Sequence, residues 1–100
     1  MAKIQFTNAA RQDLKTIFTY TIRTWGKPQA ERYAAQLKMH IDKIAQNAVF
    51  SKPVQNSRPN LRQSTVGSHL VIFEATDTET LVVRILHEAM DVSRHISSVN

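Results

Sequence analysis

Cysteine is absent from this chain. None of its 100 residues is a cysteine, which excludes disulfides, thiolate metal ligands and a catalytic thiol. No stretch approaches the roughly 18 apolar residues of a membrane span, and the amino-terminal residues lack the apolar segment of a secretory signal. The sequence therefore predicts a soluble cytoplasmic protein without membrane contact.

Glycine is nearly as scarce, with only two residues. Gly26 and Gly67 stand alone, so there is no glycine-rich phosphate loop, and no Gly-x-Ser-x-Gly elbow is present for a serine nucleophile. The segment from His87 to Asp91 departs from the His-Glu-x-x-His zinc motif because its fifth residue is Asp. If this segment were helical, His87, Asp91 and His95 would share one face, but His87 is predicted to end a strand. We therefore expect no metal and no cofactor.

Acidic residues are also few. Eight Asp and Glu stand against thirteen Lys and Arg, which gives a formal charge of +5. A basic surface favours acidic partners, whether nucleic acid, a complex that contains it, or an acidic protein segment.

The pattern of apolar residues predicts an α+β fold in the order β-α-α-β-β-β. Residues 3–6 alternate as a strand, a helix follows from Thr7 or Asn8 to about Trp25, and a second helix runs from Pro28 to Ala45. Residues 47–60 are predicted to be a loop, followed by an antiparallel meander of strands at 61–65, 68–76 and 80–87. The helical hairpin should cover one face of this antiparallel sheet. We expect one domain over residues 1–96, with a short turn or helix at 90–96 and a disordered tail at 97–100.

A basic cluster is predicted on the sheet. Arg62 and Arg84 are expected to share the face away from the helices, since Arg84 alternates with Val83 and Ile85 on the core side. A guanidinium in an apolar central strand needs a partner, because an unpaired buried charge is costly. Two alternatives stay open: contact with phosphate or an acidic protein surface, or an ion pair with Glu74, Glu88 or Asp91.

Three segments together carry a family resemblance: AARQDLKTIFTYTIRTWGKPQAERYAAQL, GSHLVIFEAT and VVRILHEAMDVSRHI. From about Phe6 to Ile96 the chain resembles the ParE toxins of the RelE/ParE superfamily, which belong to bacterial type II toxin–antitoxin systems. The resemblance implies a RelE-like fold and a non-enzymatic toxin that blocks replication by poisoning DNA gyrase. It also implies neutralisation by a ParD-like or other ribbon-helix-helix antitoxin with an acidic C-terminal segment, and only indirect contact with DNA.

Two sets of binding residues follow as expectations. For the gyrase contact we choose the basic sheet face and tail, namely Arg58, Arg62, Arg84, His87, Met90, Asp91 and His95. For the antitoxin contact we choose the helical hairpin, namely Leu14, Phe18, Tyr20, Trp25, Tyr33 and Leu37.

The other branch of the superfamily supplies the main alternative, a ribosome-dependent mRNA endonuclease. Such an enzyme needs a general base and acid with charge stabilisation. No Tyr follows Tyr33, and Glu74 stands where ParE relatives commonly have an aromatic residue. A toxin-like protein with little toxicity is a third interpretation.

Overall fold

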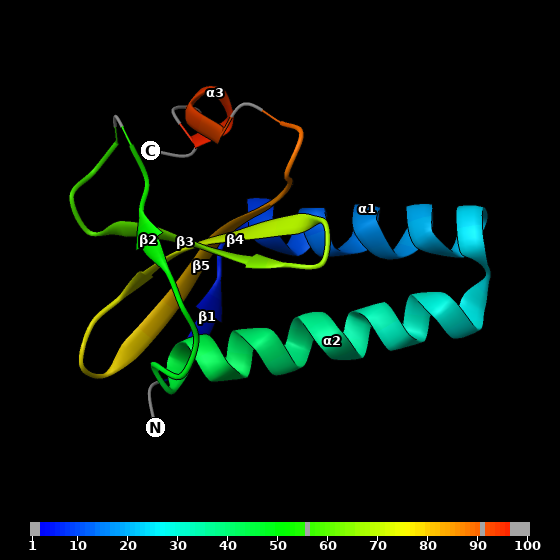
Figure 1. The fold of residues 1–100 in the computed structure, drawn as a ribbon, viewed down its shortest axis with the longest axis horizontal. Helices are drawn as coiled ribbons and strands as arrows, with labels where there is room; N and C mark the ends of the chain where they lie inside the picture. The colour runs from blue at the N-terminus through cyan, green and yellow to red at the C-terminus, as the bar shows by residue number, and fades with distance from the viewer. Residues whose placement is uncertain (1–2, 56, 91, 97–100) are drawn as a thin grey trace.

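Two antiparallel helices lie on one face of a five-stranded sheet (Figure 1). The computed structural model describes residues 3–55, 57–90 and 92–96. The elements are β1 (Lys3–Phe6), α1 (Asn8–Trp25), α2 (Lys27–Ala45), β2 (Lys52–Pro53), β3 (Leu61–Val66), β4 (His69–Ala75), β5 (Glu79–His87) and α3 (Val92–Ile96). The predicted α+β class and element order are confirmed.

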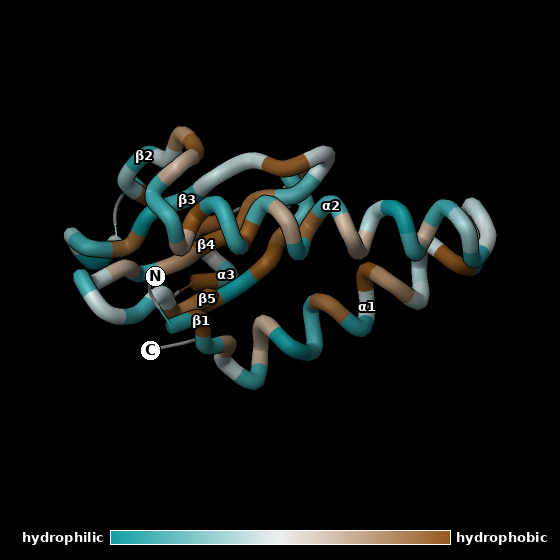
Figure 2. The backbone as a smooth tube through the Cα atoms, turned by 90° about the horizontal axis from the view of Figure 1, so that it is seen from below, coloured by the Kyte–Doolittle hydropathy of each residue, from teal (hydrophilic) through white to brown (hydrophobic). Residues whose placement is uncertain are grey.

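Helix α1 begins and ends at the residues that the sequence indicated. Thr7 is the N-cap, and its hydroxyl oxygen accepts the Ala10 N–H at 3.0 Å. Gly26 ends the helix with φ of 92° and donates its N–H to the Ile22 carbonyl. Helix α2 begins at Lys27, with Pro28 in its first turn, so Gly26 is the single residue between the two helices. The helices therefore form the predicted tight hairpin, whose connection projects beyond the sheet (Figures 1 and 2).

The sheet has the order β1-β5-β4-β3-β2, which places β4 and β5 in its interior. Strands β3, β4 and β5 form the predicted antiparallel meander. Strand β1 pairs in parallel with β5, so the sheet as a whole is mixed. The prediction of an uninterrupted loop over 47–60 was wrong at Lys52–Pro53, which pairs with β3 as a short edge strand.

Each face of the sheet carries its own apolar cluster. The face under the hairpin joins Ala10, Leu37, Ile41 and Ile44 of the helices to Val71, Phe73, Val82 and Ile85 of the strands. The opposite face packs Leu61, Ile72, Val83 and Leu86 against Val54 and Ile96, so α3 covers it. The helical turn predicted near 90–96 is therefore confirmed at Val92–Ile96. The tail predicted at 97–100 lies outside the described residues.

Strand β5 contains a β-bulge that decides where Arg84 lies. The register passes from Ile72 opposite Arg84 to Phe73 opposite Val82, so Val83 has no partner in β4. Val83 consequently packs on the α3 side, whereas Ile85 packs under the hairpin. Two residues that a regular strand would place on one face thus lie on opposite faces.

Candidate functional site

Helix α1 separates two grooves on the surface. Its Ile17 and Thr21 line both of them, as does Tyr33 of α2. The first, which we call the apolar groove, lies between α1, α2 and β1. The second, which we call the histidine groove, lies between the other flank of α1, the β3–β4 turn and the end of β5. Each has a volume of about 590 Å³.

The apolar groove is built from side chains at helical spacing. Leu14 and Phe18 come from α1, Leu37 and Ile41 from α2, and Phe6 from β1. Leu37 and Ile41 are core residues that form its floor, whereas Phe18 is 36% exposed. Lys15 and Lys38 also line this groove, together with Asp42, which pairs with Lys38 at 3.5 Å. The arrangement suits an amphipathic segment with apolar anchors and acidic flanks.

The histidine groove holds a different set of side chains. Tyr20 and Trp25 of α1 are 63% and 70% exposed, and Met90 after β5 is 45% exposed. The groove also contains His69 at the start of β4 and His87 at the end of β5. Exposed aromatic and methionine side chains beside polar groups are typical of a protein-binding surface.

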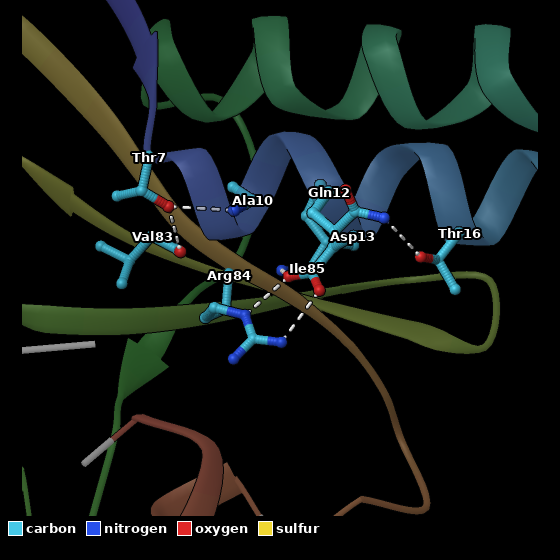
Figure 3. A network of polar contacts seen from close by, with 8 residues as sticks. All are labelled: Thr7, Ala10, Gln12, Asp13, Thr16, Val83, Arg84 and Ile85. Carbon is cyan, nitrogen blue, oxygen red and sulfur yellow. Dashed lines mark hydrogen bonds and ion pairs between the residues drawn. The ribbon is translucent and has the colours of Figure 1, made fainter. Parts of the chain in front are cut away.

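A partly buried ion pair fixes α1 to β5 in the wall of this groove (Figure 3). The Asp13 carboxylate accepts hydrogen bonds from Arg84 at 2.7 and 2.9 Å and from the Ile85 backbone N–H at 2.9 Å. The Arg84 side chain is 17% exposed and the Asp13 side chain 14% exposed. The hydrogen bonds to Asp13 raise the pKa of Arg84. Beyond the end of β1, Thr7 donates its hydroxyl to the Val83 carbonyl at 2.7 Å. The start of α1 therefore supplies hydrogen-bond partners for the backbone groups of β5 that lie beyond its pairing with β1.

The predicted basic sheet face does not form as expected. Arg84 forms an ion pair, but its partner is Asp13, so Glu74 and Glu88 were the wrong partners in the ion-pair alternative; Asp91 lies outside the described residues. Arg62 donates to Ser51 at 2.8 Å, in a hollow that also contains Ile44 and Ala45 at the end of α2.

The expectation that Arg62 and Arg84 lie on the face away from the helices was therefore wrong. Both lie on the side of the sheet that the helices cover, at separate places. Arg58 forms an ion pair with Glu74. All three guanidinium groups are thus bound to acceptors within the chain.

A tyrosine hydroxyl joins the helical hairpin to the β3–β4 turn. Tyr33 contacts Nδ1 of His69 at 2.6 Å and accepts the Ser68 N–H at 3.3 Å. Its contact with the Val66 carbonyl is longer, at 3.4 Å, so the hydroxyl proton is best placed toward His69, which then carries its own proton on Nε2. Gly67 has φ of 55°, and a Cβ atom there would lie 2.7 Å from Tyr33. Only glycine fits this close approach.

His69 and His87 form a cross-strand pair at the sheet end. Their rings are perpendicular, with centroids 5.4 Å apart. Burial lowers the pKa of His69, and the nearby charge of His87 lowers it further, against the opposing carboxylates of Glu88 and Asp13. His69 is therefore held neutral at physiological pH, which preserves its bond with the Tyr33 hydroxyl.

The two predicted binding sets are distributed across both grooves. Of the antitoxin set, Leu14, Phe18 and Leu37 line the apolar groove, Tyr20 and Trp25 line the histidine groove, and Tyr33 lines both. Of the gyrase set, Arg84, His87, Met90 and His95 line the histidine groove. Arg58 and Arg62 line neither groove.

Asp13 is the functional neighbour that the sequence reasoning missed. It is the only carboxylate in α1, and Arg84 is the only charged residue among the apolar positions of β5 between Leu81 and Leu86. Two such isolated, opposite charges are a signal that an ion pair joins the elements.

In the described ranges 3–55, 57–90 and 92–96, no three His, Cys, Asp or Glu side chains are placed together in a way that could hold a metal ion. His87 ends β5 and His95 lies in α3, so these two histidines do not share one helical face, and Asp91 lies outside the described residues. Within the same ranges, no helix is both long and apolar enough to cross a membrane.

Comparisons with known proteins agree with this architecture. The family model described as "ParE toxin of type II toxin-antitoxin system, parDE" matches residues 4–92. Toxin ParE1 of Mycobacterium tuberculosis (strain CDC 1551 / Oshkosh) is 37% identical over 89 residues, which cover 88% of this chain and 91% of that protein. Toxin ParE1 of Caulobacter vibrioides is 32% identical over 96 residues, with 96% and 99% covered.

Solved structures support the fold at lower sequence identity. The chromosomal ParDE toxin–antitoxin system from P. aeruginosa contains a chain with a TM-score of 0.73 and 19% identity, covering 87% of this chain and 96% of its own length. A chain of the E. coli DinJ-YafQ complex has a TM-score of 0.66 and 17% identity, with 89% and 96% covered. With a family model over most of its length and two relatives above 30% identity, the chain belongs to the ParE toxin family of type II toxin–antitoxin systems.

Proposed function

We propose that this ParE-family toxin inhibits DNA gyrase and so blocks replication in the bacterial cytoplasm. The match to the ParE toxin model over residues 4–92 is the observation that carries this proposal. The target would be reached by protein–protein contact, and DNA only through the gyrase complex. Four of the seven residues predicted to contact gyrase line one groove, which offers a surface for this contact: Arg84, His87, Met90 and His95.

A cognate ribbon-helix-helix antitoxin would neutralise the toxin through the hairpin. The apolar groove offers Leu14 and Phe18 as contacts above a floor that includes Leu37. Lys15 and Lys38 lie beside these apolar side chains, and the whole chain carries +5. An acidic C-terminal antitoxin segment would gain electrostatic complementarity there while its apolar residues are buried.

Gyrase assays with the purified protein test the proposed activity. Added protein should inhibit supercoiling or trap gyrase on cleaved DNA, and the protein encoded by the neighbouring reading frame should reverse this when it is added first. Inducible expression without that neighbour should arrest growth. Normal growth together with unaffected gyrase would refute the proposal.

A ribosome-dependent mRNA endonuclease is the second candidate. The observation in its favour is the paired imidazoles of His69 and His87 beside Arg84, because RNA cleavage by a ribose hydroxyl needs acid and base groups. Against it, the Arg84 guanidinium is bound to Asp13 and His69 to Tyr33. Cleavage of ribosome-bound mRNA with gyrase unaffected would favour this candidate.

A further inference from the structure

We propose that the histidine groove is the surface that receives the target protein, and that it recognises a carboxylate-bearing segment of that protein. This inference rests on the proposed function and adds the location and chemistry of the contact. It also places Tyr20 and Trp25 with the target, whereas the sequence alone assigned them to the antitoxin.

The first support is the pair of aromatic side chains at the projecting end of the hairpin. Tyr20 is 63% and Trp25 is 70% exposed, and neither forms a hydrogen bond or ring contact with the described part of the chain. Met90 faces the same groove from beyond the sheet. Exposed Trp and Tyr beside a hollow are the residue types that dominate binding energy in protein interfaces.

The second support is an excess of hydrogen-bond donors. Among the described side chains that line the groove, two carry oxygens that can only accept, namely the Asp13 carboxylate and the Gln29 amide. The first is occupied by Arg84 and the Ile85 N–H, and the second accepts from Arg32 at 2.8 and 3.3 Å. What remains for a ligand includes the Gln29 amide N–H groups and the indole N–H of Trp25, since Trp is a donor only.

His69 adds one more hydrogen-bond donor to the groove. With its Nδ1 bound to the Tyr33 hydroxyl, its Nε2 carries the proton and is also a donor. Glu88 is a carboxylate close enough to act on His69, but it is exposed and does not line the groove. Oxygen acceptors therefore complement this groove better than donors do.

The lack of a free lysine or arginine among the described lining residues favours a protein carboxylate over a nucleic-acid phosphate as the ligand. Phosphate backbones are bound mainly by free Lys and Arg side chains. Among the described residues that line the histidine groove there is no lysine, and Arg84 is held in two hydrogen bonds by Asp13. Two lysines, Lys15 and Lys38, line the apolar groove instead.

Binding measurements with purified gyrase subunits and with the antitoxin from the neighbouring reading frame test the inference. The substitutions Tyr20→Ala and Trp25→Ala should each weaken gyrase binding by about tenfold or more, as expected for an interface anchor worth about 1.4 kcal/mol. Antitoxin binding should be retained. Phe50→Ala is the matched control, because Phe50 is 83% exposed and lines neither groove. Thermal unfolding of each variant checks that the fold persists.

Competition identifies the ligand chemistry. Short poly-L-glutamate should displace gyrase from the wild-type toxin, whereas oligothymidylate of equal length should not. Displacement by oligothymidylate alone would overturn the inference in favour of nucleic acid, and unchanged gyrase binding by folded Trp25→Ala and Tyr20→Ala would overturn the location. If these variants lose antitoxin binding but keep gyrase binding, the histidine groove would be the antitoxin-binding surface and the inference would be overturned. If the wild-type toxin does not bind gyrase at all, the proposed function itself fails.

Discussion

The two flanks of helix α1 differ in what holds them to the rest of the molecule. On the apolar-groove side, Leu14 packs on the core by dispersion and burial alone. On the histidine-groove side, Asp13 forms three hydrogen bonds that reach into β5. One helix thus presents a surface that a partner can cover with apolar side chains and another whose geometry is fixed by directed polar contacts.

The largest expected effect concerns the polar flank. Asp13→Ala leaves the Arg84 guanidinium and the Ile85 N–H without their acceptor, so the free energy of unfolding should fall by about 3 kcal/mol. Urea denaturation measures this. Asp42→Ala is the matched control on the apolar-groove side, because its ion pair with Lys38 is exposed and joins successive turns of one helix. Its loss should cost only about 0.3 to 0.5 kcal/mol. Equal losses in the two variants would contradict the difference between the flanks.

A smaller effect is expected where α2 meets the β3–β4 turn. Tyr33→Phe removes the hydroxyl that contacts His69 and accepts the Ser68 N–H, and should lower the unfolding free energy by about 1 to 2 kcal/mol. Tyr20→Phe removes a hydroxyl without such bonds and should change it by less than about 0.5 kcal/mol. Similar values for both variants would mean that the Tyr33 hydroxyl does not hold the hairpin to the turn.

The smallest effect is a pH dependence of stability. Burial lowers the pKa of both His69 and His40 in the folded protein below the ordinary histidine value of 6.5. The unfolded chain therefore binds protons first as pH falls, so the unfolding free energy should decrease between about pH 7.5 and pH 5.5. Denaturation of His69→Gln at both pH values should show a smaller decrease. An unchanged or larger decrease would show that His69 does not contribute.

Much of the fold could be predicted because its signals are local. The helical spacing of α1 and α2, the cap at Thr7 and the tight connection at Gly26 each depend on neighbouring residues. The meander was indicated by short connections between strand-like runs. The parallel pairing of β1 with β5 joins residues far apart in sequence, and the periodicity of either strand contains nothing that specifies it.

The position of Arg84 could not be predicted for a physical reason. A strict alternation along β5 places Val83 and Ile85 together, but the bulge at Val83 rotates them onto opposite faces. Arg84 then meets Asp13, which is 71 positions away in sequence. Tyr20 lies outside the apolar stripe of α1, and only the folded arrangement of α1 against β5 brings it, together with Trp25, to the groove of His87 and Met90.

Hydrogen exchange of the toxin with and without gyrase tests the central claim most directly, because it reports which side of α1 is covered. Gyrase should slow exchange of the backbone N–H groups at residues 66–69 and 85–90, beside the histidine groove. Residues 34–41, under the apolar groove, should exchange as in the free toxin until the antitoxin is added. Protection by gyrase confined to residues 34–41 would contradict this account.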